Sequence, residues 1–299
     1  MTILAIVGPT ASGKSGFAVE IALRLACQGR PAEIVNADSM AVYRGMDIGT
    51  AKPTPAERAA VPHHLIDIME ITETAAVAEF RDRARAAITD IESRGVLPII
   101  VGGSALYLHA ILDELDFPKT DPAVRAKWQA KLDQLGAETL WDELNARNPA
   151  AAAGILPGNG RRIVRALEAI ELTGGFTSRL PEPVYALPGV VQLGVLIPRE
   201  VGDERIAARV DRMWLAGLVD EVRRLEALGL RRGVTASRAL GYAQVLAYLD
   251  GTLTEAQAKE RTEIATRQFS RKQLAWFRRD RRIEWAEPER FVTTALGLL

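Results

Sequence analysis

The sequence predicts an α/β protein, in which helices flank a parallel sheet and a helical insertion interrupts the chain. Three observations support this fold class. A glycine-rich stretch joins an apolar strand to an amphipathic helix, strand and helix patterns alternate over most of the chain, and one segment carries helical patterns alone. The chain has 299 residues, of which 48% are hydrophobic, so it is long enough to bury a large core.

The glycine-rich stretch is GPTASGKS, residues 8–15, and it matches the phosphate-loop pattern GxxxxGK[ST]. The apolar residues 3–7 before it indicate a buried strand, and residues 14–27 indicate an amphipathic helix, as the motif requires. In such a loop backbone N–H groups point at an anion, Lys14 adds a positive charge, and the hydroxyl of Ser15 can ligate Mg²⁺. The sequence therefore predicts a site for a diphosphate group on a P-loop NTPase-like core.

The alternation of patterns places the remaining elements. We expect strands at 3–7, 33–37, 64–68, 97–101 and 190–197, and helices at 14–27, 75–94, 104–113, 201–228 and 254–279. Between Pro118 and Pro188 the patterns are helical only. This predicts a catalytic core made of residues 1–118 and 189–299, with a helical insertion domain at 119–188.

Asp38 directly follows the strand expected at 33–37, which places it at the carboxyl end of a parallel strand beside the phosphate loop. Ligands and catalytic groups of open α/β sheets collect at this edge. The carboxylate could ligate Mg²⁺, act as a general base, or cap the following turn, and its position alone leaves all three open. Residues 43–52 carry no apolar periodicity, so they predict a loop beside this site, and long loops there are usually functional.

Composition narrows the classes of partner. The net charge is zero, but residues 257–282 contain nine Lys or Arg against three acidic residues, an excess that can steer a nucleic acid. No apolar stretch approaches the roughly 20 residues of a membrane span, so we expect no membrane partner. A single cysteine, Cys27, and an N-terminus that enters a strand without a basic leader predict a cytoplasmic protein.

The apolar strand at 97–101 ends in Gly102 and Gly103, where many phosphate-loop NTPases place an aspartate. The guanine signature NKxD is also absent, which weakens a GTPase reading. Three uses of the loop remain. The protein could be a small-molecule or nucleoside kinase, an enzyme that binds a diphosphate and transfers the group attached to it, or a nucleotide-regulated RNA-binding protein.

The accumulated motifs resemble those of the tRNA dimethylallyltransferases. The matching segments fall in order and span nearly the whole chain: GPTASGKS, NADSMAVYRGMDIGTAKP at 36–53, HHLID at 63–67, VGGSALYL at 101–108, RRIVRALE at 161–168 and ATRQFSRKQLAWFRR at 265–279. The resemblance implies transfer of a dimethylallyl group from dimethylallyl diphosphate to N6 of the adenosine next to the anticodon of a tRNA. It implies Mg²⁺ as cofactor and the anticodon stem-loop as partner, and we expect a monomer.

The resemblance also implies roles for individual residues. Asp38 would take a proton from the adenosine amine, Lys14 and Arg209 would stabilise the diphosphate from two sides, and Ser15 would hold the metal. The diphosphate substrate would bind to the whole loop, Gly8, Pro9, Thr10, Ala11, Ser12, Gly13, Lys14 and Ser15. The tRNA would contact Asp38, Ser39, Met40, Ala41, Ser104, Arg161, Arg162, Ile163, Val164 and Arg165.

Several positions carry a plainer alternative or depart from the family pattern. From the residues alone, Arg209 and the RRIVR face read as solvated helix surfaces. Ser104 stands where many members carry threonine, which keeps the hydroxyl. Ala41 replaces a longer side chain, so a contact to the RNA is expected to be missing there.

Overall fold

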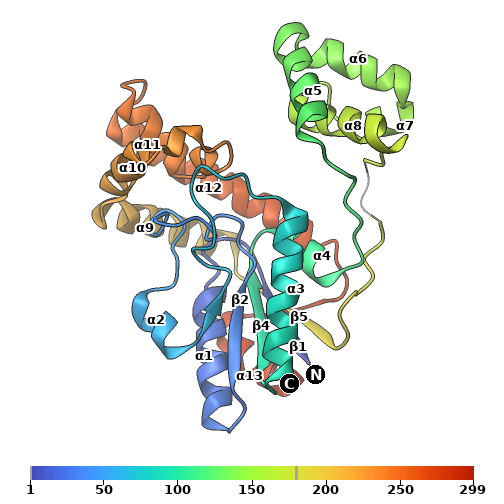
Figure 1. Cartoon of the computed structure of the whole chain (residues 1–299). Coiled ribbons are helices and arrows are strands. Elements are labelled where there is room, and N and C mark those ends of the chain that lie inside the picture. The colour runs from blue at the N-terminus through green and yellow to red at the C-terminus, as the bar shows by residue number, and fades with distance from the viewer. Residues whose placement is uncertain (1, 179–180) are drawn as a thin grey trace. The chain divides into compact units, whose positions relative to one another are not determined.

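The computed structural model describes residues 2–178 and 181–299, and it divides into two compact units. Residues 1–113 and 185–299 form the core unit, and residues 114–184 form the insertion unit. The elements of both are labelled in Figure 1. The bounds of the two units differ by a few residues from those expected. An isolated β-bridge pairs Asp113 with Tyr185, and both residues therefore belong to the core unit.

The core unit contains a parallel sheet, which confirms the predicted fold class. In the described part of the chain the sheet has six strands in the order β3-β2-β4-β1-β5-β6, and every neighbouring pair is parallel. The strands are β1 (Ile3–Val7), β2 (Ala32–Asn36), β3 (His63–His64), β4 (Leu97–Gly102), β5 (Val190–Val195) and β6 (Ile283–Ala286). The central strand β1 is fully buried, because helices cover both faces of the sheet.

Alternate residues of β1 enter two separate cores. Leu4 and Ile6 pack against α1 (Lys14–Cys27) and α13 (Pro288–Leu298), which lie on one face of the sheet. Ile3, Ala5 and Val7 belong to the core on the other face, which is covered by α3 (Val77–Ser93) and α4 (Ala105–Leu112) (Figure 1). This two-sided burial fixes the carboxyl ends of the strands as a rigid edge, on which the loops of the site are built.

Four helices extend the second core beyond the sheet: α9 (Arg199–Leu215), α10 (Leu218–Ala227), α11 (Tyr242–Leu249) and α12 (Glu255–Phe277). Helices α9 and α11 both pack against α12. Two 3₁₀ turns, Leu230–Arg232 and Ala236–Arg238, connect α10 to α11. A short helix, α2 (Pro55–Ala60), begins at Thr54, whose hydroxyl accepts a hydrogen bond from the Glu57 N–H in a capping box.

The insertion unit is helical and has its own core. Its helices are α5 (Pro122–Leu135), α6 (Ala137–Arg147), α7 (Pro149–Ala152) and α8 (Gly160–Thr173). Trp128 is fully buried at the centre of the unit, and its ring Nε1 donates to the Glu171 carboxylate at 2.8 Å. Glu168 is also fully buried, and Arg125 and Arg165 pair with it.

Two sequence predictions were wrong in their bounds. The strand expected at 64–68 is only two residues long, since Leu65 and Asp67 adopt φ values of 62° and 57°, which extended chain cannot have. The helix expected at 201–228 is two helices, because Gly217 has a φ of 93° and breaks the ladder between α9 and α10. Four further elements, α2, α11, β6 and α13, were not predicted from the sequence.

Candidate active site

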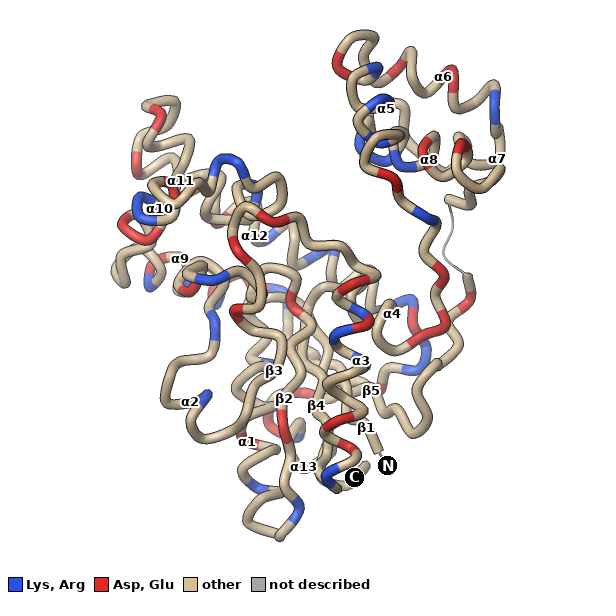
Figure 2. Tube along the Cα trace, viewed as in Figure 1, with Lys and Arg blue, Asp and Glu red and all other residues tan. Residues whose placement is uncertain are grey.

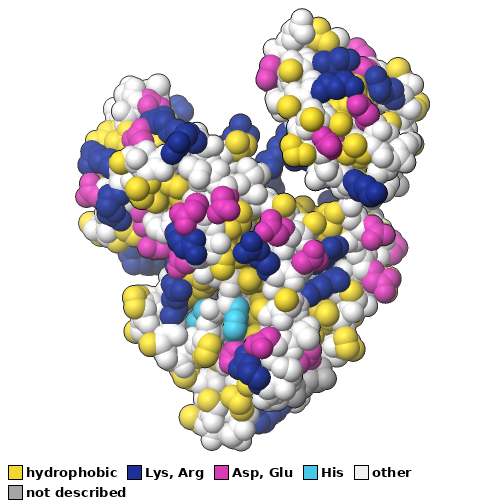
Figure 3. All heavy atoms as spheres, viewed as in Figure 1, with side chains coloured by type: hydrophobic (Ala, Val, Ile, Leu, Met, Phe, Trp, Pro, Cys, Tyr) yellow, Lys and Arg dark blue, Asp and Glu magenta, His cyan; other side chains and the backbone are white. Residues whose placement is uncertain are grey.

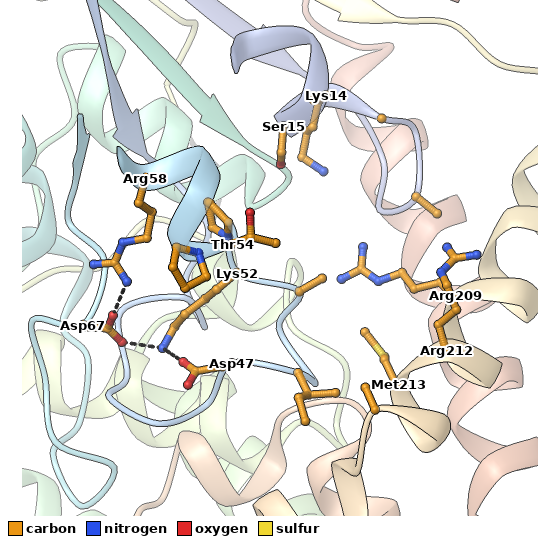
Figure 4. A pocket seen from close by; sticks show the side chains of 18 of the residues that line it. Lys14, Ser15, Asp47, Lys52, Thr54, Arg58, Asp67, Arg209, Arg212 and Met213 are labelled. Carbon is orange, nitrogen blue, oxygen red and sulfur yellow. Dashed lines mark hydrogen bonds and ion pairs between the residues drawn. The ribbon is translucent and has the colours of Figure 1, made fainter. Parts of the chain in front are cut away.

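The phosphate loop joins β1 to α1 and opens into a cavity of about 1050 Å³. Gly13 ends the loop with a φ of 94°, and Ala11 adopts a φ of 61°, so the loop folds back tightly before the helix begins. Figure 4 shows Lys14 and Ser15 at one wall of the cavity and Arg209 entering it from another element. The N–H groups at the start of α1 therefore open into a space lined by cations, which favours an anion.

Lys14 is the cation of the loop. Its ammonium donates to the Pro9 carbonyl at 3.2 Å. Desolvation in the pocket lowers the pKa of Lys14 to about 8, the Asp38 carboxylate opposes this fall, and Arg209 adds to it. A bound anion would favour the charged ammonium, so this lysine is prepared for a ligand rich in negative charge.

Arg209 reaches the same cavity from α9. Its guanidinium donates to the Thr10 hydroxyl at 3.3 Å and to the Thr50 carbonyl at 3.4 Å. Burial lowers the pKa of Arg209, and the Asp38 carboxylate opposes that effect. Two cations, Lys14 and Arg209, thus approach one space from the loop and from α9, as expected for groups that hold a diphosphate from opposite sides.

Asp38 lies just past β2 in a turn that its own side chain closes. Its Oδ1 accepts the Met40 N–H at 2.8 Å, and its N–H donates to the Asn36 side chain at 2.9 Å. Among the described residues no hydrogen bond to Oδ2 is formed. Capping of the turn, one of the three roles open from the sequence, thus uses one carboxylate oxygen and leaves the other for chemistry.

A smaller pocket of about 80 Å³ connects these groups. Thr10, Lys14, Asp38 and Arg209 all line it, together with apolar side chains of the sheet and α1. The structure therefore brings the three predicted catalytic residues, Lys14, Asp38 and Arg209, to one place, although they lie far apart in the sequence.

The phosphate-loop residues divide into two groups. Five of them line one or both pockets: Thr10, Ala11, Gly13, Lys14 and Ser15. The other three are buried away from them. Gly8 and Pro9 are buried, and the Ser12 N–H donates to the Pro9 carbonyl at 3.3 Å. The Ser12 carbonyl accepts a hydrogen bond from the Arg205 guanidinium at 3.3 Å. Gly8, Pro9 and Ser12 therefore stabilise the conformation of the loop and do not line either pocket.

The residues expected to receive the target base cluster beside Asp38. The Ser39 N–H donates to the Ser104 hydroxyl at 3.2 Å, and that hydroxyl lies 3.2 Å from the Ser39 hydroxyl. Met40 is partly exposed, whereas Ala41 is 5% exposed and packs inward. Ala41 also lines the smaller pocket with Asp38.

The loop after Tyr43 is held by a buried carboxylate that the sequence analysis missed. Glu221 of α10 is 1% exposed and accepts the N–H groups of Asp47 at 3.1 Å and Ile48 at 2.8 Å. The Tyr242 hydroxyl donates to the same carboxylate at 2.6 Å. Because Glu221 lies in an ordinary amphipathic helix pattern, nothing in the sequence distinguished it from a solvated glutamate.

The same loop is tied on its other side by Lys52. The Lys52 ammonium pairs with Asp47 and Asp67, and Arg58 pairs with Asp67 at 2.8 Å, as the dashed lines of Figure 4 show. The loop thus presents the Thr50 carbonyl to Arg209 from a fixed position.

The RRIVR segment of α8 contributes less surface than expected. The side chains of Ile163 and Val164 are buried in the insertion core, which removes them as direct contacts to tRNA. Arg165 pairs with the buried Glu168 at 2.8 Å and donates to the Lys119 carbonyl at 3.0 Å. Only Arg161 and Arg162 are exposed, so the tRNA-binding prediction for this helix narrows to these two arginines.

The basic C-terminal segment is partly neutralised. Lys259 pairs with Asp211, Arg271 with Asp203, and Arg267 with Glu263. Figure 2 accordingly shows blue and red segments interleaved over α9–α12. Exposed cations with no ion pair to any described residue are Arg261, Lys272, Arg278, Arg279 and Arg281. The segment keeps a positive face, but a smaller one than its composition suggests.

The site fits a magnesium ion of the kind that is bound with a substrate. Among the described residues no cluster of three or more His, Cys, Asp or Glu could form a cage by itself. Mg²⁺ usually takes one or two protein oxygens and completes its shell with phosphate oxygens and water. Ser15, whose hydroxyl opens into the large cavity, is a suitable single ligand.

The chain was compared with known proteins. A family model described as IPP transferase matches residues 41–280. A curated tRNA dimethylallyltransferase from Kineococcus radiotolerans is 61% identical over 95% of this chain and 90% of its own length, and one from Thermobifida fusca is 60% identical over 95% and 89%. The crystal structure of a tRNA isopentenylpyrophosphate transferase from Bacillus halodurans is 38% identical, covers 99% of this chain and 94% of its own, and has a TM-score of 0.71.

Proposed function

Because this chain belongs to the IPP transferase family, we propose that it transfers a dimethylallyl group from dimethylallyl diphosphate to N6 of an adenosine in tRNA. The acceptor is the adenosine adjacent to the anticodon, which must leave its stack to reach a crevice at the edge of the sheet. The relatives that match nearly the whole chain are transferases, so the kinase alternative has no support left.

The observation that carries the proposal is the position of Lys14, Asp38 and Arg209 around one small pocket. The N6 amine attacks the first carbon of the dimethylallyl group, the carbon–oxygen bond to the diphosphate breaks, and the amine proton passes to the free oxygen of Asp38. Negative charge grows on the departing diphosphate, and Lys14 and Arg209 stabilise it. An exocyclic amine of adenine is a poor nucleophile, so stabilisation of the leaving group is the larger requirement.

Ser15 and the diphosphate oxygens would hold Mg²⁺ in this reaction. When bound, the ion supplies further positive charge against the leaving group. The chain's own contribution is the loop itself, whose amides and Lys14 orient the diphosphate so that its ester oxygen points toward the pocket that Asp38 lines.

The proposed RNA contacts are Arg161 and Arg162 of the insertion unit, Ser39, Met40 and Ser104 beside Asp38, and the exposed unpaired cations in and after α12. Figure 3 shows Lys and Arg side chains gathered on one face of the insertion unit. We further propose that the protein acts as a cytoplasmic monomer. No helix of the described residues combines the length and apolar character that crossing a membrane requires.

One assay separates this function from phosphoryl transfer. The protein, Mg²⁺ and tRNA are incubated with either dimethylallyl diphosphate or ATP, and the tRNA nucleosides are analysed by mass spectrometry. We expect one prenylated adenosine next to the anticodon and one inorganic diphosphate per turnover with the first donor, and no ADP with the second. Stoichiometric ADP without any prenylated nucleoside would contradict the proposal.

A further inference from the structure

Gln273 of α12 bridges the two sides of the site. Its side chain is 6% exposed, its Oε1 accepts the Thr10 N–H at 2.8 Å, and its Nε2 donates to the Gly103 carbonyl at 2.8 Å. Thr10 belongs to the phosphate loop after β1, whereas Gly103 follows β4. One amide group from a helix late in the chain therefore joins the loops that follow two adjacent strands of the sheet.

Two close approaches account for the glycines at the end of β4 and directly after it. A Cβ at Gly103 would lie 2.5 Å from the Gln273 Nε2, and a Cβ at Gly102 would lie 2.5 Å from the Ala37 carbonyl oxygen. The neutral amide that arrives from α12 thus fills the space that a side chain at Gly103 would enter. Glycine is required at Gly102, where a Cβ would collide with backbone, whereas a Cβ at Gly103 would displace the Gln273 amide from its contacts.

Hydrogen bonds of neighbouring residues extend this link toward Asp38 on one side and toward Arg209 on the other. Gly103 precedes Ser104, whose hydroxyl accepts the Ser39 N–H, and Ser39 follows Asp38. On the other side, Thr10 carries the hydroxyl that accepts from Arg209. Gln273 is therefore the one described side chain that hydrogen-bonds both to Thr10, on the diphosphate side of the site, and to Gly103, the residue before Ser104.

We propose that Gln273 is a positioning residue, which sets the separation between the leaving-group cradle and the proton acceptor. This inference rests on the proposed prenyl transfer and assigns to Gln273 no contact with either substrate. The amide is suited to the task because it accepts on one side and donates on the other, which a carboxylate or an apolar side chain cannot do.

The neutrality of the amide matters as much as its hydrogen bonds. A carboxylate at this position would still accept the Thr10 N–H, but it would face the Gly103 carbonyl with an acceptor and would place a negative charge beside the loop that holds a diphosphate. Gln273→Glu therefore disturbs both distance and charge, whereas Gln273→Met has nearly the same length and removes both hydrogen bonds without adding charge.

The chain supplies a matched control. Gln268 lies five residues earlier on the same helix and is exposed, so Gln268→Glu and Gln268→Met make the same chemical changes outside the site. For each variant the experiment measures kcat and KM for tRNA and for dimethylallyl diphosphate, the affinity for inorganic diphosphate, and the melting temperature.

For Gln273→Met we expect kcat to fall by about 10- to 100-fold, the scale of a misplacement near 1 Å, with both KM values and the diphosphate affinity within about threefold of the wild type. For Gln273→Glu we expect a similar loss of kcat and weaker binding of inorganic diphosphate as well. The two Gln268 variants should match the wild type in every measurement.

Two results would overturn the inference. The first is a Gln273→Met protein with wild-type kcat. The second is a Gln273→Met protein in which kcat, the affinities for tRNA and for diphosphate, and the melting temperature all fall together. That pattern marks a purely structural role. If Gln273→Met does not fold, Gln273→Glu decides: a loss of kcat with wild-type KM for tRNA and melting temperature supports the inference, and either wild-type kcat or a joint fall that includes the melting temperature overturns it. A wild-type protein without prenyl transfer would instead refute the proposed function, and this inference with it.

Discussion

At the scale of single residues, the two oxygens of Asp38 have different environments. Oδ1 accepts the Met40 N–H and thereby fixes the rotamer of the side chain. The carboxylate also lines the small pocket with Lys14 and Arg209. A group held by its own turn and bordered by cations is oriented before substrate arrives, which is what a proton acceptor for a weak nucleophile needs.

The Asp38→Asn variant tests this role. The amide keeps the shape and can still accept the Met40 N–H, but it cannot take a proton, so we expect single-turnover prenyl transfer to slow by about 100-fold or more. Affinity for tRNA, measured by titration, should stay within about threefold of the wild type. A variant that transfers at the normal rate would remove Asp38 as the base, and an equal loss of tRNA affinity would make it a binding residue.

Lys14 gives the site a predicted pH dependence. Desolvation lowers the pKa of its ammonium to about 8, so the ligand-free protein loses this charge as the pH rises through 8. Above pH 7 phosphate groups are already largely ionised. We therefore expect kcat/KM for dimethylallyl diphosphate to fall about tenfold per pH unit above pH 8, because this parameter reports groups of the free enzyme.

The matched variant for this profile is Lys14→Arg. A guanidinium stays protonated to well above pH 12, so the profile should become flat between pH 7.5 and 9.5 whatever the absolute rate. An unchanged fall in Lys14→Arg would assign the pH dependence to another group.

At the scale of elements, α9 presents three arginines to the large cavity. Arg205, Arg209 and Arg212 have i, i+4 and i+7 spacing, which places them on one face of the helix, and all three line the cavity. Arg209 is partly buried, whereas Arg205 and Arg212 are exposed. We propose that the exposed pair attracts the diphosphate from solvent and that the partly buried Arg209 holds it.

Replacing the exposed pair tests this division. In Arg205→Gln/Arg212→Gln we expect kcat/KM for dimethylallyl diphosphate to fall about tenfold at low salt, with kcat within about threefold, and a weaker dependence of kcat/KM on salt concentration. The control is Arg199→Gln, which removes a charge from the same helix outside the cavity, at a side chain that is 67% exposed. Equal salt dependence in both proteins would show that these arginines do not attract the substrate.

The loop at 43–53 shows how an element can be irregular and still rigid. Glu221 holds its N–H groups from α10, and Lys52 ties it to Asp67. A Cβ at Gly49 would lie 2.3 Å from the ring of Tyr242, so glycine is required where the loop passes this side chain. Such a loop has no periodic pattern to predict, because its partners lie elsewhere in the chain.

At the scale of the whole molecule, charges that cancel in total still leave local surfaces that are positively charged. The net charge is zero, yet exposed cations without an ion-pair partner among the described residues occur in α8 of the insertion unit and after α12 in the core unit. Binding to a tRNA backbone should therefore depend on a few arginines and lysines, and each one that contacts a phosphate contributes to the salt dependence of affinity.

The variant Arg161→Gln/Arg162→Gln tests the insertion unit. We expect weaker binding of all tRNA substrates and a slope of log affinity against log salt that is smaller by about one unit per lost phosphate contact. The control, Arg24→Gln/Arg30→Gln, removes two exposed charges near the far end of α1. If titrations at several salt concentrations give the same slope for both proteins, the α8 arginines are only solvated.

Features that depend on neighbours in the chain could be predicted from the sequence. The strand, loop and helix of residues 3–27, the parallel sheet and the position of Asp38 at a strand end all follow from local periodicity and one short motif. The bounds of the strand expected at 64–68 and of the helix expected at 201–228 were wrong. Residues with positive φ end an element in each of these segments, although the apolar pattern continues.

Which polar groups meet could not be predicted from the sequence. Gln273 lies 263 residues from Thr10, and Glu221 lies 173 residues from Ile48, so no spacing in the sequence connects them. The same is true of Arg165, whose charge is directed to the buried Glu168. Hydrogen bonds and ion pairs act over a few ångströms, and folding alone brings residues so far apart in the chain within that range.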